Sequence, residues 1–294
     1  MQGNQALGIA SEVRKAWHWL VFRLHIRLPR IMAVVERQLP LRGVDDDVYT
    51  TLPDLGWAIP STVYQTWTAG GFGRSHRATI RALRKRNASF SFVFYDDAMI
   101  EDYMERYYGD HPIHDVFKNA QFGALRTDIW RYALLYERGG IYIDISKSID
   151  LPLARLLTPI APALISWEGK ASPFEPSARA RSVLQHPDNI LLNWALMFAP
   201  RHPLLKRVID GIVDKYPDYR GIAFREPKQA ILDFTGPHHL TECLLAAADA
   251  GEMDTAVQAS TDFLDRAQWY APGAWVRYLE RPAYDIARDR VIVR

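Results

Sequence analysis

Cysteine and long apolar runs are both scarce in this sequence, and each scarcity excludes a class of protein. One cysteine, Cys243, is present among 294 residues, so no internal disulfide can form and a reducing compartment is favoured. The aromatic and basic stretch 15–27 contains Arg23 and Arg27 and falls short of the ~20 apolar residues that a membrane span needs. It also lacks the order of charges, apolar region and cleavage site of a secretory signal. We therefore expect a cytoplasmic protein without a transmembrane helix.

Neither sign of charge dominates, and several familiar ligand motifs are missing. The formal net charge is +2 at pH 7 and the basic residues form no stripe, so we expect no nucleic-acid binding. The sequence has no Gly-x-Ser-x-Gly elbow, no Gly-x-x-x-x-Gly-Lys loop and no Gly-x-Gly-x-x-Gly fingerprint. These absences weigh against hydrolases, P-loop proteins and dinucleotide-binding enzymes. The composition, 48% hydrophobic and 24% charged, is that of a globular protein.

Two regions of different character are expected along the chain. Residues 1–56 are expected to form an N-terminal helical extension and a linker, because Pro40, Gly43 and an acidic triplet interrupt the pattern before residue 57. From residue 57 to 294 strands alternate with helices, with strands expected at 62–66, 90–95 and 163–167 and helices at 75–86 and 97–107. Such alternation predicts one α/β domain with a mostly parallel sheet.

The segment 121–148 carries the strongest functional signal. Apolar side chains occupy one broad face of its expected helix, which predicts that the helix is largely buried. Asp128 and Arg131 lie one turn apart in the narrow remaining sector, where they can reach each other or a common ligand. A Gly-Gly pair then ends the helix and opens a strand that delivers Asp144 to its carboxyl end. Open α/β sheets present ligand-binding groups at this edge, so we expect the three residues to converge.

This segment resembles the sugar-nucleotide site of the family 32 glycosyltransferases, in which an Asp and an Arg three residues apart precede Gly-Gly-Ile-Tyr-Ile-Asp. The family includes fungal initiating mannosyltransferases and bacterial capsular polysaccharide transferases. Three further segments are similar to it: 59–67 resembles its first strand, 193–203 its middle helix, and 235–237 a later loop. Together the four cover about residues 57–240. The resemblance implies a single GT-A-type, Rossmann-like nucleotide-sugar-binding domain.

The resemblance also implies roles for individual residues. Trp67 matches an aromatic that stacks on the donor base, and Asp128 and Arg131 match groups that hold the ribose, the donor sugar or the diphosphate. Asp144 matches the first carboxylate of the family's Asp-x-Asp motif, which binds the sugar or a divalent metal. Ser146 takes the place of the second carboxylate, so a hydroxyl replaces a charged ligand. Mn²⁺ or Mg²⁺ is the expected cofactor, held by Asp144 and Ser146 with diphosphate and water as further ligands.

Several other positions have both a functional and a purely structural interpretation. Arg179 and Arg181 lie in an expected loop at 169–182 that either closes over a donor diphosphate or is a plain surface loop. Asn193 and His238 are candidates for contact with an acceptor or a metal. The Asp128 and Arg131 pair can also be read as a structural ion pair, Trp67 as a core residue and Tyr142 as packing.

The expected function is transfer of a hexose from a nucleoside-diphosphate sugar to a glycan, lipid-linked or protein acceptor. The resemblance implies retention of configuration and a place in surface polysaccharide or glycoconjugate synthesis. The stretch 15–27 interleaves Trp, Phe and Leu with Arg, which is compatible either with peripheral contact at the inner face of a membrane or with packing on the catalytic domain. The alternative function is a catalytically degenerate nucleotide-sugar-binding or scaffold protein, in which Ser146 marks lost catalysis.

Overall fold

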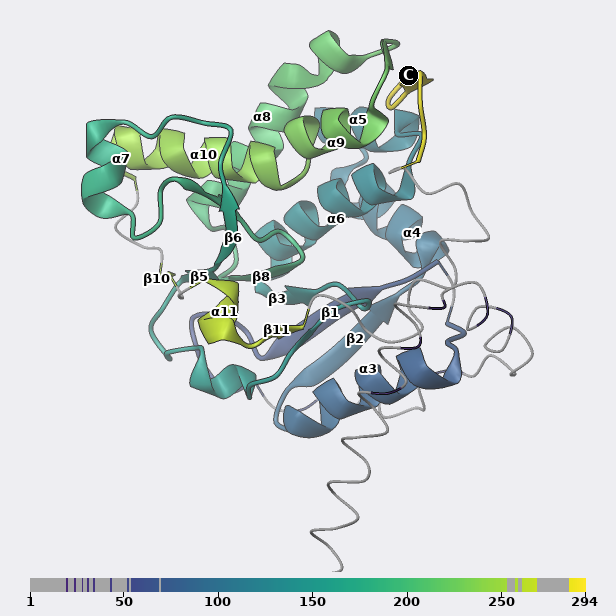
Figure 1. Cartoon of the computed structure of the whole chain (residues 1–294), viewed down its shortest axis with the longest axis vertical. Coiled ribbons are helices and arrows are strands. Elements are labelled where there is room, and N and C mark those ends of the chain that lie inside the picture. Colours follow the sequence, from purple (N-terminus) through teal and green to yellow (C-terminus); the bar gives the residue numbers. More distant parts are fainter. Residues whose placement is uncertain are drawn as a thin grey trace, which may run out of the picture.

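A six-stranded sheet forms the centre of the computed structural model, in the order β10-β5-β8-β3-β1-β2 (Figure 1). Its strands all point the same way except β8, which is antiparallel to both of its neighbours. The strands are β1 (Thr62–Thr66), β2 (Ser91–Tyr95), β3 (Gly140–Ile143), β5 (Ala163–Ile165), β8 (Ala195–Phe198) and β10 (Val257–Gln258). The structure describes residues 54–294 except 69, 253–256, 259–260 and 269–285, together with single positions between 20 and 52.

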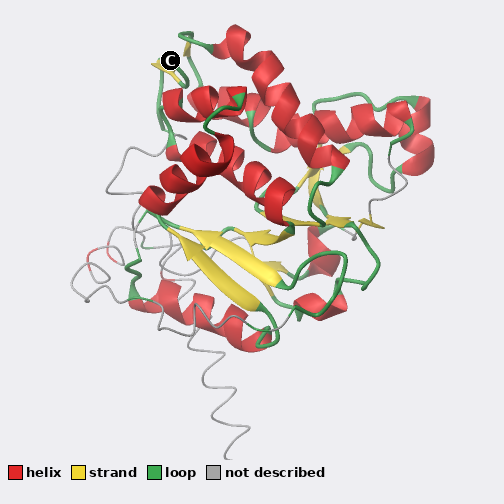
Figure 2. Cartoon of the chain, turned by 180° about the vertical axis from the view of Figure 1, so that it is seen from behind, coloured by secondary structure: helices red, strands yellow, loops and turns green. Residues whose placement is uncertain are grey.

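Helices cover both faces of this sheet. Helix α3 lies on one face and α4 and α6 on the other, with α8, α9 and α10 stacked beyond α6, an arrangement that the view from behind also shows (Figure 2). The helices are α3 (Arg74–Arg86), α4 (Asp97–Tyr108), α5 (Pro112–Asn119), α6 (Gly123–Arg138), α7 (Ala178–Val183), α8 (Pro203–Tyr219), α9 (Pro227–Phe234), α10 (Pro237–Ala250) and the short α11 (Asp262–Asp265).

Three small antiparallel pairs tie the connecting segments to the sheet domain. They are β4 (Ser148–Ile149) with β11 (Ala267–Gln268), β6 (Trp167–Ala171) with β7 (Asn189–Leu191), and β9 (Ala223–Phe224) with β12 (Arg290–Val291). A single 3₁₀ turn, η2 (Leu153–Arg155), follows β4. The β6–β7 pair and β4 both follow carboxyl ends of sheet strands, and they therefore build up the edge where a ligand is expected.

The two faces of the sheet bury two different apolar clusters, as the two-residue period of a strand requires. On β3, Ile141 and Ile143 pack toward α3, whereas Tyr142 between them packs toward α6. Helix α6 is buried along most of its length, including Trp130 and Tyr132, because α8 covers the side that faces away from the sheet. Burial of α6 on both sides confirms the apolar pattern expected for 121–138.

Glycine is required at both positions between α6 and β3. The backbone there has positive φ, and a side chain would collide with neighbouring atoms. Gly139 and Gly140 have φ of 61° and 102°, a region that side chains with a Cβ rarely adopt. A Cβ on Gly140 would lie 2.8 Å from the carbonyl oxygen of Thr62 and 2.9 Å from the ring of Tyr64. The pair therefore lets β3 start directly against β1, and this register sets where Asp144 lies.

The predicted α/β class with a mostly parallel sheet is confirmed. The expected strand 62–66 is β1, the expected strand 90–95 is β2, and the expected helices 75–86 and 97–107 are α3 and α4 within one residue. The helical setting of Cys243 is α10, where its side chain is 6% exposed, as a small hydrophobic residue would be. The predicted extension 1–56 lies almost entirely outside the described residues.

Three sequence expectations were wrong. Residues 193–200 do not form a helix, because Ala195–Phe198 are the fully buried strand β8, paired on both sides with β3 and β5. The expected strand 163–167 is two strands, since the chain leaves the sheet after Ile165 and Trp167 starts β6 against β7. The expected loop 169–182 contains the end of β6 and the start of α7.

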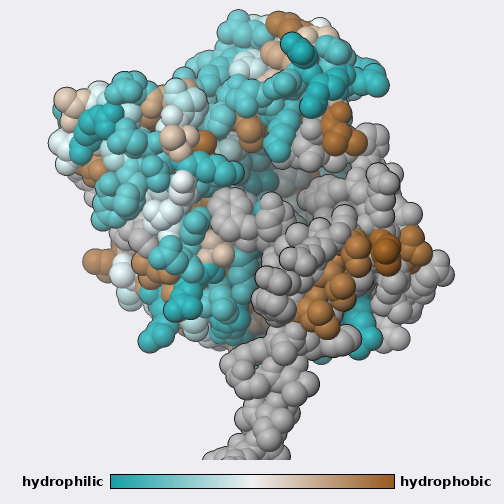
Figure 3. Space-filling view, viewed as in Figure 1, coloured by the Kyte–Doolittle hydropathy of each residue, from teal (hydrophilic) through white to brown (hydrophobic). Residues whose placement is uncertain are grey.

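Within the described residues no helix is both long enough and apolar enough to cross a membrane. The face seen in Figure 3 is mostly hydrophilic over α7 to α10.

The Gly-Gly pair gives a direct test of the register of β3. We expect Gly140→Ala to lower the free energy of unfolding by about 2 kcal/mol or more, because the new methyl group meets a carbonyl oxygen and a ring in a strained backbone. Gly123→Ala is the matched control, since it opens α6 with nothing within 4 Å of an added Cβ. Urea unfolding of both variants measures the difference. Equal stability of the two variants would contradict the close approach of β3 and β1.

Candidate active site

Helix α6 holds Asp128 and Arg131 on its buried side. Each residue is 5% exposed, and Arg131 Nη2 lies 3.2 Å from Asp128 Oδ1. The two residues therefore reach each other, as their spacing predicted. A buried ion pair is tolerated only where further hydrogen bonds satisfy both partners. The neighbouring segments supply those bonds.

The guanidinium of Arg131 is engaged by the protein on every side. Nη1 donates to the carbonyl oxygen of Asn193 at 2.5 Å, and Nη2 lies 3.5 Å from Asp144 Oδ1. Nε donates to the carbonyl oxygen of Thr127 at 3.4 Å, and the group sits 4.4 Å from the ring centroid of Tyr142. Burial alone would lower the pKa of Arg131, but Tyr142 and the two nearby carboxylates raise it above its ordinary value. The positive charge of Arg131 is therefore permanent.

Asp128 uses both of its oxygens within the fold. The Asn193 side-chain amide donates to Oδ1 at 3.2 Å, and the Thr235 hydroxyl donates to Oδ2 at 3.1 Å. Burial raises the pKa of Asp128 to about 7, against the opposing effects of Arg131 and the Thr235 hydrogen bond. Asp128 thereby joins α6 to the loop before β8 and to the end of α9.

Asp144 is the carboxylate of this group that reaches the surface. Its side chain is 27% exposed, compared with 8% for Asp128. The Tyr142 hydroxyl donates to Asp144 Oδ1 at 2.5 Å, and burial raises the pKa of that phenol well above its ordinary value, so it keeps its proton. Tyr142 and Arg131 both make their closest approach to Oδ1. The second oxygen, Oδ2, is therefore the one that can face a ligand.

The turn after Asp144 adds a hydroxyl and a cation. The Lys147 N–H donates to the Asp144 carbonyl at 2.9 Å, which closes the turn around Ser146. Ser146 is half-buried, and among the described residues its hydroxyl has no hydrogen-bond partner. Burial lowers the pKa of Lys147, while Asp144 and Glu168 act in the opposite direction. This turn thus places a partly buried hydroxyl and a partly buried amine next to Asp144 in the chain.

Trp67 directly follows β1 on the same edge of the sheet. Its ring packs edge-on against His76 of α3, with centroids 5.4 Å apart, and is partly buried on the cluster that contains Ile145. His76 Nε2 lies 2.8 Å from the carbonyl oxygen of Ile145, the residue after Asp144. Trp67 and Asp144 are thus tied to each other through two intervening residues. Its base-stacking role stays a prediction.

Some contacts in this site were missed from the sequence. Tyr142 was read as packing, and its ring does pack on Trp130, but its hydroxyl also holds Asp144. The sequence marks Thr235 only as part of a loop and gives His76 no role. No local sequence signal marks these residues, because their partners lie 107 and 69 positions away in the chain.

Three other candidates have partners elsewhere. His238 Nδ1 lies 2.6 Å from Asp233 Oδ1, on the neighbouring helix α9. Arg179 donates to the carbonyl oxygen of Ala248 at 3.1 Å, and Arg181 pairs with two exposed carboxylates, Glu175 and Asp188. The expectation that these arginines meet a diphosphate has no support in these contacts. Asn193, in contrast, is part of the Arg131 network.

A divalent metal would find an incomplete set of protein ligands here. Among the described residues, no three His, Cys, Asp or Glu side chains lie together in a way that could hold an ion. Asp144 Oδ2 and the unpaired Ser146 hydroxyl are hard oxygen donors on one turn, which is the chemistry that Mg²⁺ and Mn²⁺ prefer. These residues fit a cation whose remaining ligands come from a bound phosphate and water.

Part of the site, with Asp128, Arg131, Asp144 and Ser146, lies within a region that matches a known family. Residues 73–160 match the model of the family described as "Glycosyltransferase sugar-binding region containing DXD motif". This stretch contains α3, α6, β3 and the turn with Asp144 and Ser146. The match confirms the resemblance to sugar-binding glycosyltransferases that the sequence shows.

Curated relatives agree with this match. The chain is 27% identical over 135 residues to the initiation-specific alpha-1,6-mannosyltransferase of Saccharomyces cerevisiae, covering 44% of this chain and 28% of the relative. It is 24% identical over 220 residues to inositol phosphoceramide mannosyltransferase 3 of Schizosaccharomyces pombe, covering 72% of this chain and 52% of the relative. The chain thus spans between about a quarter and a half of the length of these two proteins. A solved structure of PaToxG glycosyltransferase is 14% identical, with a TM-score of 0.45, over 81% of this chain and 82% of that chain.

The raised pKa of Asp128 makes a prediction about stability and pH. Its folded value of about 7 lies above the ordinary 3.8, so the folded state binds the extra proton. This contribution is fully present below about pH 4 and is lost as the pH rises through about 7. We therefore expect Asp128→Asn to remove part of the fall in unfolding free energy between these two pH values. Asp218→Asn, at an exposed position on α8, is the control. Urea unfolding across the range measures this slope, and an unchanged slope in Asp128→Asn would contradict the assignment.

Proposed function

We propose that this protein is a glycosyltransferase that takes a sugar from a nucleoside-diphosphate sugar. The observation that carries the proposal is Asp144, 27% exposed at the carboxyl end of β3, with Oδ1 held by Tyr142 and Arg131 and Oδ2 left available for a ligand. Ligands of open α/β sheets bind at this edge. The family match over residues 73–160 supports the sugar chemistry. Because the relatives are named mannosyltransferases, mannose is the first donor sugar that we propose to test.

In this proposal Asp128 and Arg131 act through Asp144. Their polar atoms form hydrogen bonds or ion pairs with Asn193, Thr235 and each other. In this proposal they therefore position the end of β3 and do not bind the donor directly. Asp144 Oδ2 would accept hydrogen bonds from donor-sugar hydroxyls or bind a cation. Trp67, on the same edge, would stack on the base.

The chemistry requires that negative charge on the departing diphosphate be stabilised. Asp144 and Ser146 would hold a divalent cation together with phosphate oxygens and water, and that cation would neutralise the leaving group. Lys147, in the same turn, would add a second positive charge close to the phosphates. Arg179 and Arg181 have no part in this scheme because they are bound elsewhere.

The acceptor and the setting are proposed more broadly. The acceptor is a glycan, a lipid-linked sugar or a protein, the reaction retains configuration, and the product belongs to a surface polysaccharide or glycoconjugate. A peripheral position at the inner face of a membrane agrees with the exposed apolar side chains of Leu20, Leu28, Ile31 and Val34, which are 44–58% exposed.

The second candidate function is donor binding without transfer. The observation that favours it is Ser146, where a neutral hydroxyl stands in place of a charged metal ligand. The two functions differ in turnover. A transferase hydrolyses its donor slowly when no acceptor is present, whereas a binding protein only gains thermal stability from the donor.

Replacement of Asp144 tests the proposed function. We expect Asp144→Asn to lower donor turnover on the order of a hundredfold or more, because a preorganised charge at the reacting centre is lost while the side-chain shape is kept. Donor hydrolysis would be measured with a panel of nucleoside-diphosphate sugars, with circular dichroism as a check of folding. Asp110→Asn, an exposed aspartate in the turn after α4, is the matched control. Full turnover in folded Asp144→Asn would refute the proposal.

Replacement of Ser146 tests the cation. We expect Ser146→Asp to bind Mn²⁺ more tightly in the presence of nucleoside diphosphate, because a charged oxygen joins Asp144 on the same turn. Activity does not have to rise with affinity. Isothermal titration measures the change, with Ser89→Asp, an exposed serine before β2, as the control. If the Mn²⁺ affinity of Ser146→Asp stays at the wild-type value, residue 146 does not face the metal.

A further inference from the structure

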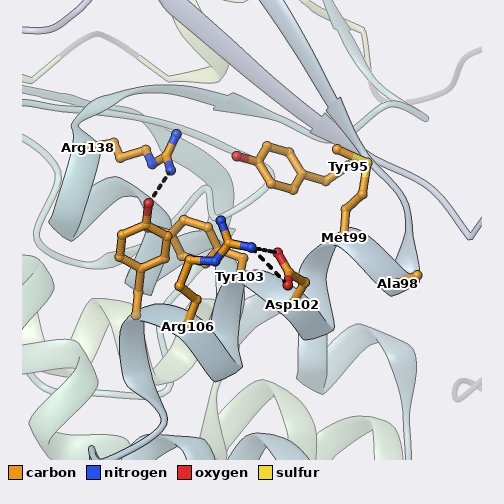
Figure 4. Close-up of a pocket in the computed structure, with 8 residues that line it drawn as sticks. Tyr95, Ala98, Met99, Asp102, Tyr103, Arg106 and Arg138 are labelled. Atoms are coloured by element: carbon orange, nitrogen blue, oxygen red, sulfur yellow. Dashed lines mark hydrogen bonds and ion pairs between the residues drawn. The ribbon is translucent and has the colours of Figure 1, made fainter.

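A pocket opens beside α4, and neither Asp144 nor Ser146 lines it. Its volume is about 430 Å³, within the range of small-molecule sites. Tyr95 from the end of β2, Tyr103 from α4 and Arg138 from the end of α6 lie around it (Figure 4), and Tyr107 of α4 also lines it. Nothing in the proposed transfer reaction uses these residues.

Arg138 is an exposed cation that lies beside the rings of Tyr103 and Tyr107. Its Nη2 donates to the Tyr107 hydroxyl at 3.0 Å, and its guanidinium lies 5.3 Å from the ring centroids of both Tyr103 and Tyr107. No carboxylate of the described residues pairs with it, and its pKa is raised by tyrosines against the lowering effect of burial. Arg126 on the same helix and Arg106 at the pocket rim, in contrast, are each paired with a carboxylate.

The phenols around Arg138 can donate hydrogen bonds into the pocket. Tyr103 is 3% exposed, and its buried hydroxyl has no acceptor for its proton among the described residues. The hydroxyl of Tyr95 points toward Arg138 (Figure 4). Burial raises the pKa of both phenols, so they remain protonated at neutral pH. One unpaired cation and converging O–H donors favour a bound anion.

We propose that this pocket binds a small molecule that carries a phosphate or carboxylate group on a ring. The anion contacts Arg138 and the hydroxyls of Tyr95 and Tyr103. The ring packs on Tyr107 and Met99, which are 47% and 38% exposed at the pocket wall. Carbonyl or amide ligands would leave the guanidinium without a counter-charge.

This pocket is distinct from the Asp144 site but adjoins it through buried rings. Tyr95 packs on Trp130 with centroids 5.0 Å apart, and Trp130 packs on Tyr142 at 6.1 Å. Tyr142 in turn holds Asp144. Trp130 therefore contacts one residue of each site.

Isothermal titration of the full chain with phenyl phosphate, benzoate and phenol tests the proposal. We expect phenyl phosphate or benzoate to bind one to one, with phenol at least about tenfold weaker, because it lacks the charge-assisted hydrogen bonds. A tighter phenyl phosphate identifies a phosphate ligand, and a tighter benzoate identifies a carboxylate ligand. Equal affinity for phenol and the two anions would overturn the proposal, as would no binding at all.

Matched variants show whether that binding belongs to this pocket. Arg138→Gln should weaken the anion at least about tenfold, and Tyr103→Phe should weaken it severalfold while removing only one hydroxyl. Arg126→Gln removes a comparable arginine that stacks on Phe117, and it should leave the affinity unchanged. Asp144→Asn should also leave it unchanged, whatever happens to donor turnover. Wild-type affinity in Arg138→Gln and Tyr103→Phe, or loss of binding in Asp144→Asn, would contradict this assignment.

Discussion

The rest of the site depends on the buried guanidinium of Arg131. A charge this deep in the protein is costly unless each of its donors finds an acceptor, so the segments that supply the acceptors are fixed around it. Helix α6 supplies Asp128, the end of β3 supplies Asp144, and the loop before β8 supplies the Asn193 carbonyl. The Asn193 loop lies 62 positions from Arg131 in the chain, and Arg131 brings it to the same point as the two aspartates.

The burial of Arg131 divides the residues of the family motif into two groups with different roles. The polar atoms of Asp128 and Arg131 are hydrogen-bonded within the protein. Among the described residues, Asp144 Oδ2 and the Ser146 hydroxyl have no such partner. In our proposal the inner residues orient the outer ones, and the outer ones meet the ligand. Serine at position 146, in place of the second carboxylate of the Asp-x-Asp motif, therefore changes the ligands available to a cation. It does not disturb the buried network of Arg131.

Local patterns predicted most of the sheet, helix α6 and the convergence of its charged pair with Asp144. They succeeded because the burial of α6, the Gly-Gly break and the strand after it are all encoded within 28 residues. They failed for 193–200, where four buried apolar residues fit a short strand as well as a helix, and the pairing of β8 with β3 and β5 decides. Thr235 and His76 could not be predicted either, because their contacts depend on how distant segments meet.

The most direct test of the Asp144 assignment is a crystal structure of the protein with a bound nucleoside-diphosphate sugar. If Asp144 is the ligand-facing carboxylate, its Oδ2 will lie within hydrogen-bond or metal-ligand distance of the donor, while Arg131 will keep its contacts with Asn193 and Asp128. A donor bound away from the carboxyl end of β3, or one that draws Arg131 out of its buried network to contact the diphosphate, would contradict the division between inner and outer residues.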